Sequence, residues 1–338
     1  MMHEHIGRSV SDDGFPYPAK QYGTEEEQHL ASSPVSLENL WWVRYHLRDN
    51  LDNVATPADD PVWLTEVSRY AAAGGGTLVE VTPAGVLDAA RLIELSQKTN
   101  VHVVLGTGWY IDGSYPDAHR VEERDVSWLA DKMTADILKG DAETGAKAGI
   151  IGEIGCSWPL TPNEAKVLRA SAIAQANTGV SISVHPGRNE AALGEIRDIL
   201  HSEGADLSRV IMGHMDRCGY ELDTRKDIAD SGVVLEYDVF GLEGYYPAEA
   251  ALADGAMPEM PNDTGRIKQI MELMDLGYRD QIVVGHDIHM KMQMTAFGGW
   301  GYGHFLRNVV PLMKIWGMSS QDVDQLIIDN PNRLLAMV

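Results

Sequence analysis

The sequence predicts a (β/α)₈ barrel of the TIM type. This prediction rests on a repeated pattern of strands and helices and on the number of its repeats. Short runs rich in β-branched residues recur along the chain, and each is followed by a longer stretch with the apolar spacing of a helix. Seven such runs are evident and an eighth unit must precede Ala71. Eight strand–helix units are the number that closes a parallel sheet into a barrel. We therefore expect one barrel domain over residues 1–338.

The individual elements follow from composition and from capping signals. The predicted strands lie at residues 77–82, 101–107, 149–154, 180–185, 209–214, 233–238 and 281–287. The predicted helices between them include residues 86–99, 162–178, 190–202 and 264–276. Thr161, with Glu164 three residues later, forms a capping box that opens the second of these helices.

The N-terminal part of the chain fits the barrel pattern least well. His3 and His5 would lie at the C-terminal end of the first strand, yet only Met1 and Met2 precede them. Either translation starts further upstream, or the first strand is truncated and the barrel is incomplete. Residues 7–60 are rich in Pro, Asp and Ser, which predicts a long loop with one helix at residues 37–47.

The amino-acid composition limits which binding partners we expect. The chain has 50 acidic and 27 basic residues, and its formal charge of −23 would repel a phosphate backbone, which excludes nucleic acid as an expected partner. No apolar run approaches the roughly 20 residues that cross a bilayer, so we expect no membrane association. The two cysteines, Cys156 and Cys218, are expected to be buried packing residues, and their small number fits the reducing cytoplasm.

Five of the predicted strands, counting the deficient first one, end in side chains that bind metal ions. These side chains are His3, His5, Glu153, His185, His214 and Asp287. The C-terminal ends of barrel strands converge on one face, so we expect these residues to be neighbours. Four imidazoles and two carboxylates suit zinc or a similar cation, and six ligands are too many for one tetrahedral ion. We therefore expect two divalent cations, with zinc as the expected metal and a carboxylate shared between them.

The same residues lie in longer motifs that resemble a known family. The motifs are the HxH pair of His3 and His5, IIGEIGCSWPLT at 150–161, VHPGR at 184–188, LEYDVFG at 235–241, HDIHMK at 286–291 and GGWGYGH at 298–304. Their order is similar to that of the phosphotriesterase family of the amidohydrolase superfamily, over nearly the whole chain from His3. The resemblance is to a branch whose members cleave N-acyl amino acids and N-acyl taurines. It implies a hydrolase that cleaves a small amide or ester, with an N-acetylated anionic compound as the leading substrate.

The resemblance also implies roles for the ligands. His3, His5 and Asp287 would bind the more buried metal, His185 and His214 would bind the exposed one, and Glu153 would bridge them. In several relatives the bridge is a carboxylated lysine, whereas Glu153 is already a carboxylate. A hydroxide held between the cations would attack the scissile carbonyl, and Asp287 would accept its proton as the catalytic base.

Candidate substrate contacts follow the strands. Arg217 occupies a position where phosphotriesterases proper tend to have an acidic residue, and it would bind an anionic group of the substrate. The other candidates are Arg188, Trp109, Tyr110, Tyr237 and His289. Core packing is an equal alternative for the aromatic residues, as is an internal salt bridge for Arg188. His286 should point away from the site because it adjoins Asp287 on a strand.

Two other functions stay open at this point. The same centre would suit a lactonase or a phosphotriesterase. If the short N-terminus does not deliver His3 and His5, the chain would be a metal-stabilised binding protein without catalysis. The sequence also leaves a homodimer open.

Overall fold

The chain forms a curled parallel sheet of the TIM-barrel-like α/β type. The computed structural model describes residues 1–7, 24–57, 59–83, 88–116, 119–243 and 260–337. In the described residues, seven strands follow one another around the sheet in chain order, and all neighbours pair in parallel. They are Thr77–Glu80 (β1), His102–Thr107 (β2), Ala148–Gly155 (β3), Ile182–His185 (β4), Val210–Met212 (β5), Val234–Tyr237 (β6) and Ile282–Val284 (β7). All the predicted strands are present, although most are shorter than expected.

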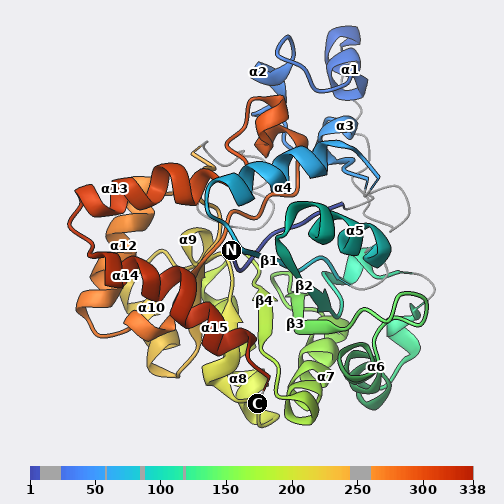
Figure 1. The fold of residues 1–338 in the computed structure, drawn as a ribbon. Coiled ribbons are helices and arrows are strands. Elements are labelled where there is room, and N and C mark those ends of the chain that lie inside the picture. The colour runs from blue at the N-terminus through green and yellow to red at the C-terminus, as the bar shows by residue number, and fades with distance from the viewer. Residues whose placement is uncertain (8–23, 58, 84–87, 117–118, 244–259, 338) are drawn as a thin grey trace.

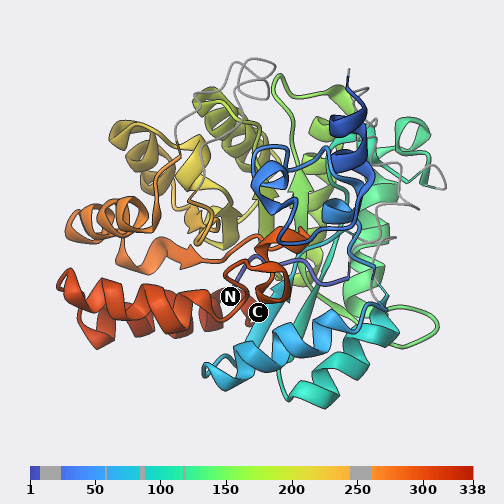
Figure 2. The same ribbon diagram turned by 90° about the horizontal axis from the view of Figure 1, so that it is seen from above.

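Residues 1–6 lie between the first and last strands of this sheet. The amide of Met2 donates to the carbonyl of Val284, and the amide of Glu4 donates to that of Val79, each at 3.0 Å. An isolated parallel bridge pairs Glu4 with Glu80. The N-terminus therefore lies within the fold in both views (Figures 1 and 2), and Figure 1 shows it next to β1.

Helices surround the strands on the outside (Figures 1 and 2). They include Val62–Ala72 (α4), Ala89–Thr99 (α5), Val126–Leu138 (α6), Pro162–Thr178 (α7), Glu190–Ser202 (α8), Met215–Cys218 (α9), Leu222–Asp230 (α10), Asp263–Asp275 (α12), Val310–Ile315 (α13), Ser320–Asp324 (α14) and Asn330–Leu335 (α15). The predicted capping box of Thr161 and Glu164 is present. The helix expected at 86–99 begins at Ala89 behind its N-cap Asp88, and residues 84–87 lie outside the described residues.

The prediction of one helix at 37–47 is wrong. The described part of this region instead contains three short helices, Glu25–Ser32 (α1), Leu40–Val43 (α2) and Leu51–Val54 (α3). The side-chain amide of Asn50 donates to the carbonyls of Leu30 and Ser33, and its side-chain oxygen caps α3, so Asn50 ties α3 to the end of α1. These helices share a small apolar cluster with Met290 and Met292 after β7.

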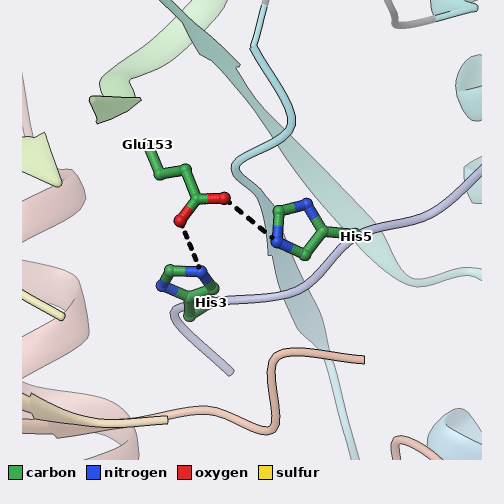
Figure 3. A group of neighbouring side chains, drawn as sticks. All are labelled: His3, His5 and Glu153. Carbon is green, nitrogen blue, oxygen red and sulfur yellow. Dashed lines mark ion pairs between the residues drawn. The ribbon is translucent and has the colours of Figure 1, made fainter. Parts of the chain in front are cut away.

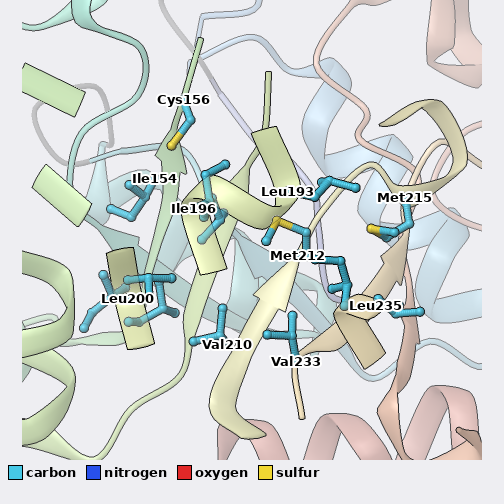
Figure 4. Packing of buried hydrophobic residues seen from close by; sticks show 14 of the residues in the cluster. Ile154, Cys156, Leu193, Ile196, Leu200, Val210, Met212, Met215, Val233 and Leu235 are labelled. Atoms are coloured by element: carbon cyan, nitrogen blue, oxygen red, sulfur yellow. The ribbon is translucent and has the colours of Figure 1, made fainter. Parts of the chain in front are cut away.

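The core has two layers that follow the alternation of side chains along each strand. Inside the sheet lies a cluster that contains Met2, Val79, Ile150, Ile211, Val234 and Val283. The larger cluster lies between the strands and the outer helices. Figure 4 shows part of it, where Leu193, Ile196 and Leu200 of α8 face residues of the neighbouring strands such as Val210 and Met212.

The structure also bears on the two cysteines and on membrane-spanning helices. Cys156 and Cys218 are free and buried in the core, as expected. Within the described residues, no helix has the length and apolar character needed to cross a membrane.

Candidate metal centre

Glu153, on β3, stands at the centre of the converging side chains. Its Oε2 lies 3.3 Å from Nε2 of His3, and its Oε1 lies 3.4 Å from Nε2 of His5 (Figure 3). Nδ1 of His185, at the end of β4, lies 3.0 Å from Oε2 on the other side. One carboxylate therefore contacts three histidines, which come from the N-terminal segment and from the end of β4.

Asp287 and His214 complete the group. Oδ1 of Asp287 lies 3.2 Å from Nε2 of His5 and 3.9 Å from Nε2 of His3. Nε2 of His214 lies 2.7 Å from Nδ1 of His185 and 3.8 Å from Oε2 of Glu153. The structure thus brings all six predicted ligands together at one end of the sheet.

The spacing of these atoms fits two cations that share Glu153. Ligand atoms at about 2.0–2.2 Å from a tetrahedral zinc are separated by about 3.3 Å, which is close to the distances around Glu153. Two overlapping groups, His3–His5–Glu153 and Glu153–His185–His214, have donor atoms within 4.8 Å of one another. Nε2 of His3 is buried and makes no hydrogen bond within the described residues, as expected for an atom reserved for a metal.

A second set of acidic and hydroxyl groups orients the histidine rings. Nδ1 of His3 lies 3.2 Å from Glu236 and from Asp238, and Nδ1 of His214 lies 2.7 Å from Asp238. Nδ1 of His5 lies 2.7 Å from Oγ1 of Thr82. Such partners fix the ring orientation and the tautomer of a metal-binding histidine.

Our sequence reasoning missed these partners, although a signal was present. Glu236 and Asp238 alternate with Tyr237, so both carboxylates face the inside of the sheet and the ring of Tyr237 faces the helices. Acidic side chains at alternate positions of a buried strand would have indicated the inward face.

Two of the six residues sit on strained backbone. His214 and Asp287 have φ angles of 56° and 51°, in the left-handed region that residues other than glycine seldom adopt. Each follows a three-residue strand, β5 or β7, and turns the chain at the mouth of the sheet. Strained residues of this kind cluster at functional sites.

The electrostatics keep the two outer histidines neutral. Burial lowers the pKa of His185 to about 4, and Arg217 adds to this shift. Burial, Arg217 and His185 hold the pKa of His214 well below its ordinary value. Neutral imidazole is the form that binds a metal, so these two residues are ready to do so at pH 7.

The pKa values of His3, Glu153 and Asp287 are shifted in the directions that favour the charged forms of these side chains. Burial lowers the pKa of His3, but Asp238 and Glu153 outweigh it and raise that pKa well above its ordinary value. Burial raises the pKa of Glu153 and of Asp287, but neighbouring histidines, His185 first for Glu153, bring both pKa values well below the ordinary range. Both carboxylates are therefore ionised at pH 7.

A pocket opens over these side chains. It is lined by His5, Leu47, Arg48, Tyr110, Glu153, His185, Arg188, Arg217, Val239, Leu242, Met260, Asp287, His289 and Met290. Arg217 is 7% exposed, and its Nη2 lies 3.5 Å from Nε2 of His185. The hydroxyl of Tyr110 lies 3.1 Å from the same nitrogen. Of the predicted substrate contacts, Arg217, Arg188, Tyr110 and His289 line the pocket.

The predictions for Trp109 and Tyr237 as pocket walls are corrected by the structure. Both are buried in the core between sheet and helices, and Nε1 of Trp109 donates to His119 at 2.9 Å. His286 points away from the centre as expected, with Nδ1 2.6 Å from Glu4. Lys291, on the loop after β7, pairs with Asp52 at 2.6 Å and does not line the pocket.

Comparisons with known proteins agree with this geometry. The Phosphotriesterase family model matches residues 2–335. N-acetyltaurine hydrolase of Dictyostelium discoideum is 41% identical over 92% of this chain and 82% of that protein. The Homo sapiens protein of the same name is 36% identical over 99% of this chain and 93% of its own.

A solved structure extends the similarity to the fold. The resiniferatoxin-binding protein from Rhodobacter sphaeroides superposes with a TM-score of 0.89 and 32% identity, over 99% of this chain and 90% of that one. The chain is a hydrolase that belongs to the phosphotriesterase family, a family of binuclear metal-dependent enzymes.

Proposed function

We propose that this hydrolase cleaves N-acetyltaurine, or a closely related N-acetylated anion, into acetate and the free amine. The observation that carries the proposal is Arg217, a buried guanidinium that lines the pocket beside His185. A sulfonate or carboxylate would pair with this cation, whereas a neutral ester would gain little from it. The names of the two hydrolase relatives support the same substrate.

We also propose which residues hold the metals. His3, His5, Glu153 and Asp287 would hold one cation, and Glu153, His185 and His214 would hold the other. Zinc fits this donor set of imidazoles and carboxylates. Bound there, two such cations would polarise the amide carbonyl and make water acidic enough to react near neutral pH.

The residues of the chain would then orient the substrate and move the proton. Asp287, ionised at pH 7, would accept the proton of the attacking water and later give it to the leaving amine. His289 would keep Asp287 in place, because its Nδ1 lies 2.7 Å from the carbonyl and 3.1 Å from Oδ1 of Asp287. Arg217 would hold the anionic end of the substrate.

Four broader features belong to the same proposal. Residues 1–6 would take the place of the remaining barrel strand, because they bond to both β1 and β7. The chain would act as one domain.

Two buried free cysteines favour a reducing, cytoplasmic location. A homodimer would cover the exposed side chains of Leu37, Trp41 and Tyr45.

The test is a hydrolysis panel with metal analysis on the same preparation. The panel contains N-acetyltaurine, N-acetylated α-amino acids, a neutral N-acetyl amide, an unsubstituted lactone and a neutral phosphotriester. We expect N-acetyltaurine or an N-acetylated amino acid to be cleaved best, with about two metal ions per chain. A preference for the lactone or the phosphotriester would replace the proposal with that activity. A fully metallated protein that cleaves none of them would favour a binding function.

A further inference from the structure

Arg266, on α12, is a buried cation outside the pocket. It is 0% exposed. Its Nε donates to Asp216 at 2.9 Å, its Nη1 to Asp263 at 2.8 Å and its Nη2 to the carbonyl of Leu242 at 3.0 Å. Burying a guanidinium is costly unless such partners surround it.

The contacts of Arg266 reach segments that carry pocket residues. Asp216 precedes Arg217 in the four-residue helix α9, and its Oδ2 also accepts from the amide of Val239 at 3.1 Å. Val239 and Leu242, after β6, line the pocket together with Arg217. Arg266 itself does not line the pocket, but it holds the backbone of the residues that do.

The far end of this network uses a motif that the metal centre does not. Asp263 accepts from the amide of Gly241 at 2.9 Å and lies 2.7 Å from Nε2 of His304, the last residue of the GGWGYGH motif. A Cβ atom at Gly241 would lie 2.4 Å from the ring of Trp300, in the same motif. The motif therefore packs against the pocket wall at Gly241 and fixes Asp263.

We propose that Arg266 is a positioning residue for substrate binding, which acts on Arg217 by holding α9 through Asp216. The inference rests on the proposed role of Arg217 in binding an anionic substrate. The proposed role of Arg266 concerns substrate binding and not metal binding. The proposed ligand His214 is held by a different residue, Asp238, which accepts from the backbone amide of His214 at 2.9 Å and lies 2.7 Å from its Nδ1.

A double-mutant cycle tests this role on the N-acetylated anion that the wild-type protein cleaves best. Arg266→Lys keeps the charge but loses the planar fork that contacts both carboxylates. We expect it to raise KM roughly tenfold, as for partial loss of one charged contact, with kcat and metal content unchanged. In an Arg217→Met background the same substitution should change KM by less than about twofold, because coupled residues are not additive. KM for the neutral N-acetyl amide should change far less than KM for the anion in each of these variants.

The matched control is Arg209→Lys. Arg209 is also buried, but it donates to the carbonyls of Arg333 and Leu334 at the opposite end of the sheet. We expect this variant to lower the unfolding temperature and to leave KM unchanged. Asp216→Asn is the second variant in case Arg266→Lys does not fold, and it should reproduce the rise in KM.

Three outcomes would overturn the inference. Additive effects of Arg266→Lys and Arg217→Met would show that Arg266 does not act through Arg217. Equal losses on the anionic and neutral amides, or a rise in KM in Arg209→Lys, would show a general effect on stability. In these cases N-acetyltaurine cleavage by the wild-type protein would still stand. If the wild-type protein cleaves only neutral substrates, the proposed function fails first and the role of Arg266 falls with it.

Discussion

The two ring nitrogens of His3 face different surroundings. Nε2 faces Glu153 at 3.3 Å, and Nδ1 faces Glu236 and Asp238 at 3.2 Å. These carboxylates raise the pKa of His3 well above its ordinary value although the ring is buried. In the metal-free protein, His3 therefore keeps its second proton to a higher pH than an ordinary histidine, and a cation at Nε2 must displace a proton.

We therefore expect metal binding to release a proton from His3. Because the metal-free form holds this proton below its raised pKa, metal affinity should fall as the pH falls, by about tenfold per pH unit for each proton released. Calorimetric titration of the apo-protein with zinc, in buffers of different ionisation enthalpy, counts the protons. Glu236→Gln should reduce the count, whereas Asp275→Asn on the surface of α12 should not. Zinc binding with no dependence on buffer would contradict this assignment.

Asp287 is the proposed proton acceptor, and its role can be separated from metal binding. Asn at this position keeps the shape of the side chain but cannot accept a proton. We expect Asp287→Asn to lower kcat roughly 10²–10⁴-fold in samples with full metal content. The base would be misassigned if a fully metallated Asp287→Asn protein turned over at the wild-type rate.

Arg217 sets the expected preference for anions. Arg217→Met keeps the bulk and removes the charge, so KM for the anionic amide should rise roughly ten- to a hundredfold, as for one charged contact of about 1.5–3 kcal/mol. KM for the neutral N-acetyl amide should change far less. Losses of the same size on both substrates would mean that Arg217 only supports the structure.

At the scale of elements, hydrogen bonds join the N-terminal segment to the loop after β7. Glu4, between His3 and His5, accepts from the amides of His286 at 3.0 Å and Ile288 at 3.2 Å. The HxH pair is thereby fixed to the segment that carries Asp287.

Weakening this junction should weaken the metal centre. We expect Glu4→Gln to lower zinc affinity roughly tenfold or more, because charge-assisted hydrogen bonds that fix two ligand segments are lost. Competition with a chromophoric chelator measures the change. Glu66→Gln is the matched control, since Glu66 is a buried carboxylate on α4 that accepts from the amides of Thr295 and Ala296. Equal zinc affinity in the Glu4→Gln and wild-type proteins would refute the role of Glu4.

The regular elements could be predicted from the sequence because they repeat. β-Branched runs marked every strand from β1 to β7, and each predicted ligand lies at or near the end of such a run or in the HxH pair. The N-terminal region could not be predicted this way, because α3 depends on the side-chain cap of Asn50 and both α2 and α3 pack in a cluster with Met290. Tyr237 was misplaced because its position at the end of a strand was considered without the face of the sheet on which its side chain lies.

At the scale of the whole molecule, the core is independent of the proposed metal centre. The clusters inside and outside the sheet are built from apolar side chains, and the six proposed ligands are not among them. Removing the metals should therefore abolish hydrolysis while leaving most secondary structure in place.

Chelation tests this independence. We expect the far-ultraviolet circular dichroism of the chelated protein to match the native spectrum and the unfolding temperature to fall, because bound metal stabilises the folded state in proportion to its affinity. Activity should return on addition of zinc. Loss of all secondary structure on chelation would instead indicate a structural role for the metals.

The contact between the N-terminal segment and the loop after β7 also has a consequence for biosynthesis. Glu4 and Ile288 are 284 positions apart, yet their bond joins the HxH pair to Asp287. A ribosome makes His3 and His5 long before it reaches Asp287. The binding site for the first cation therefore cannot form until the segment that carries Asp287 has emerged, because the histidines depend on an acidic partner that is distant in sequence.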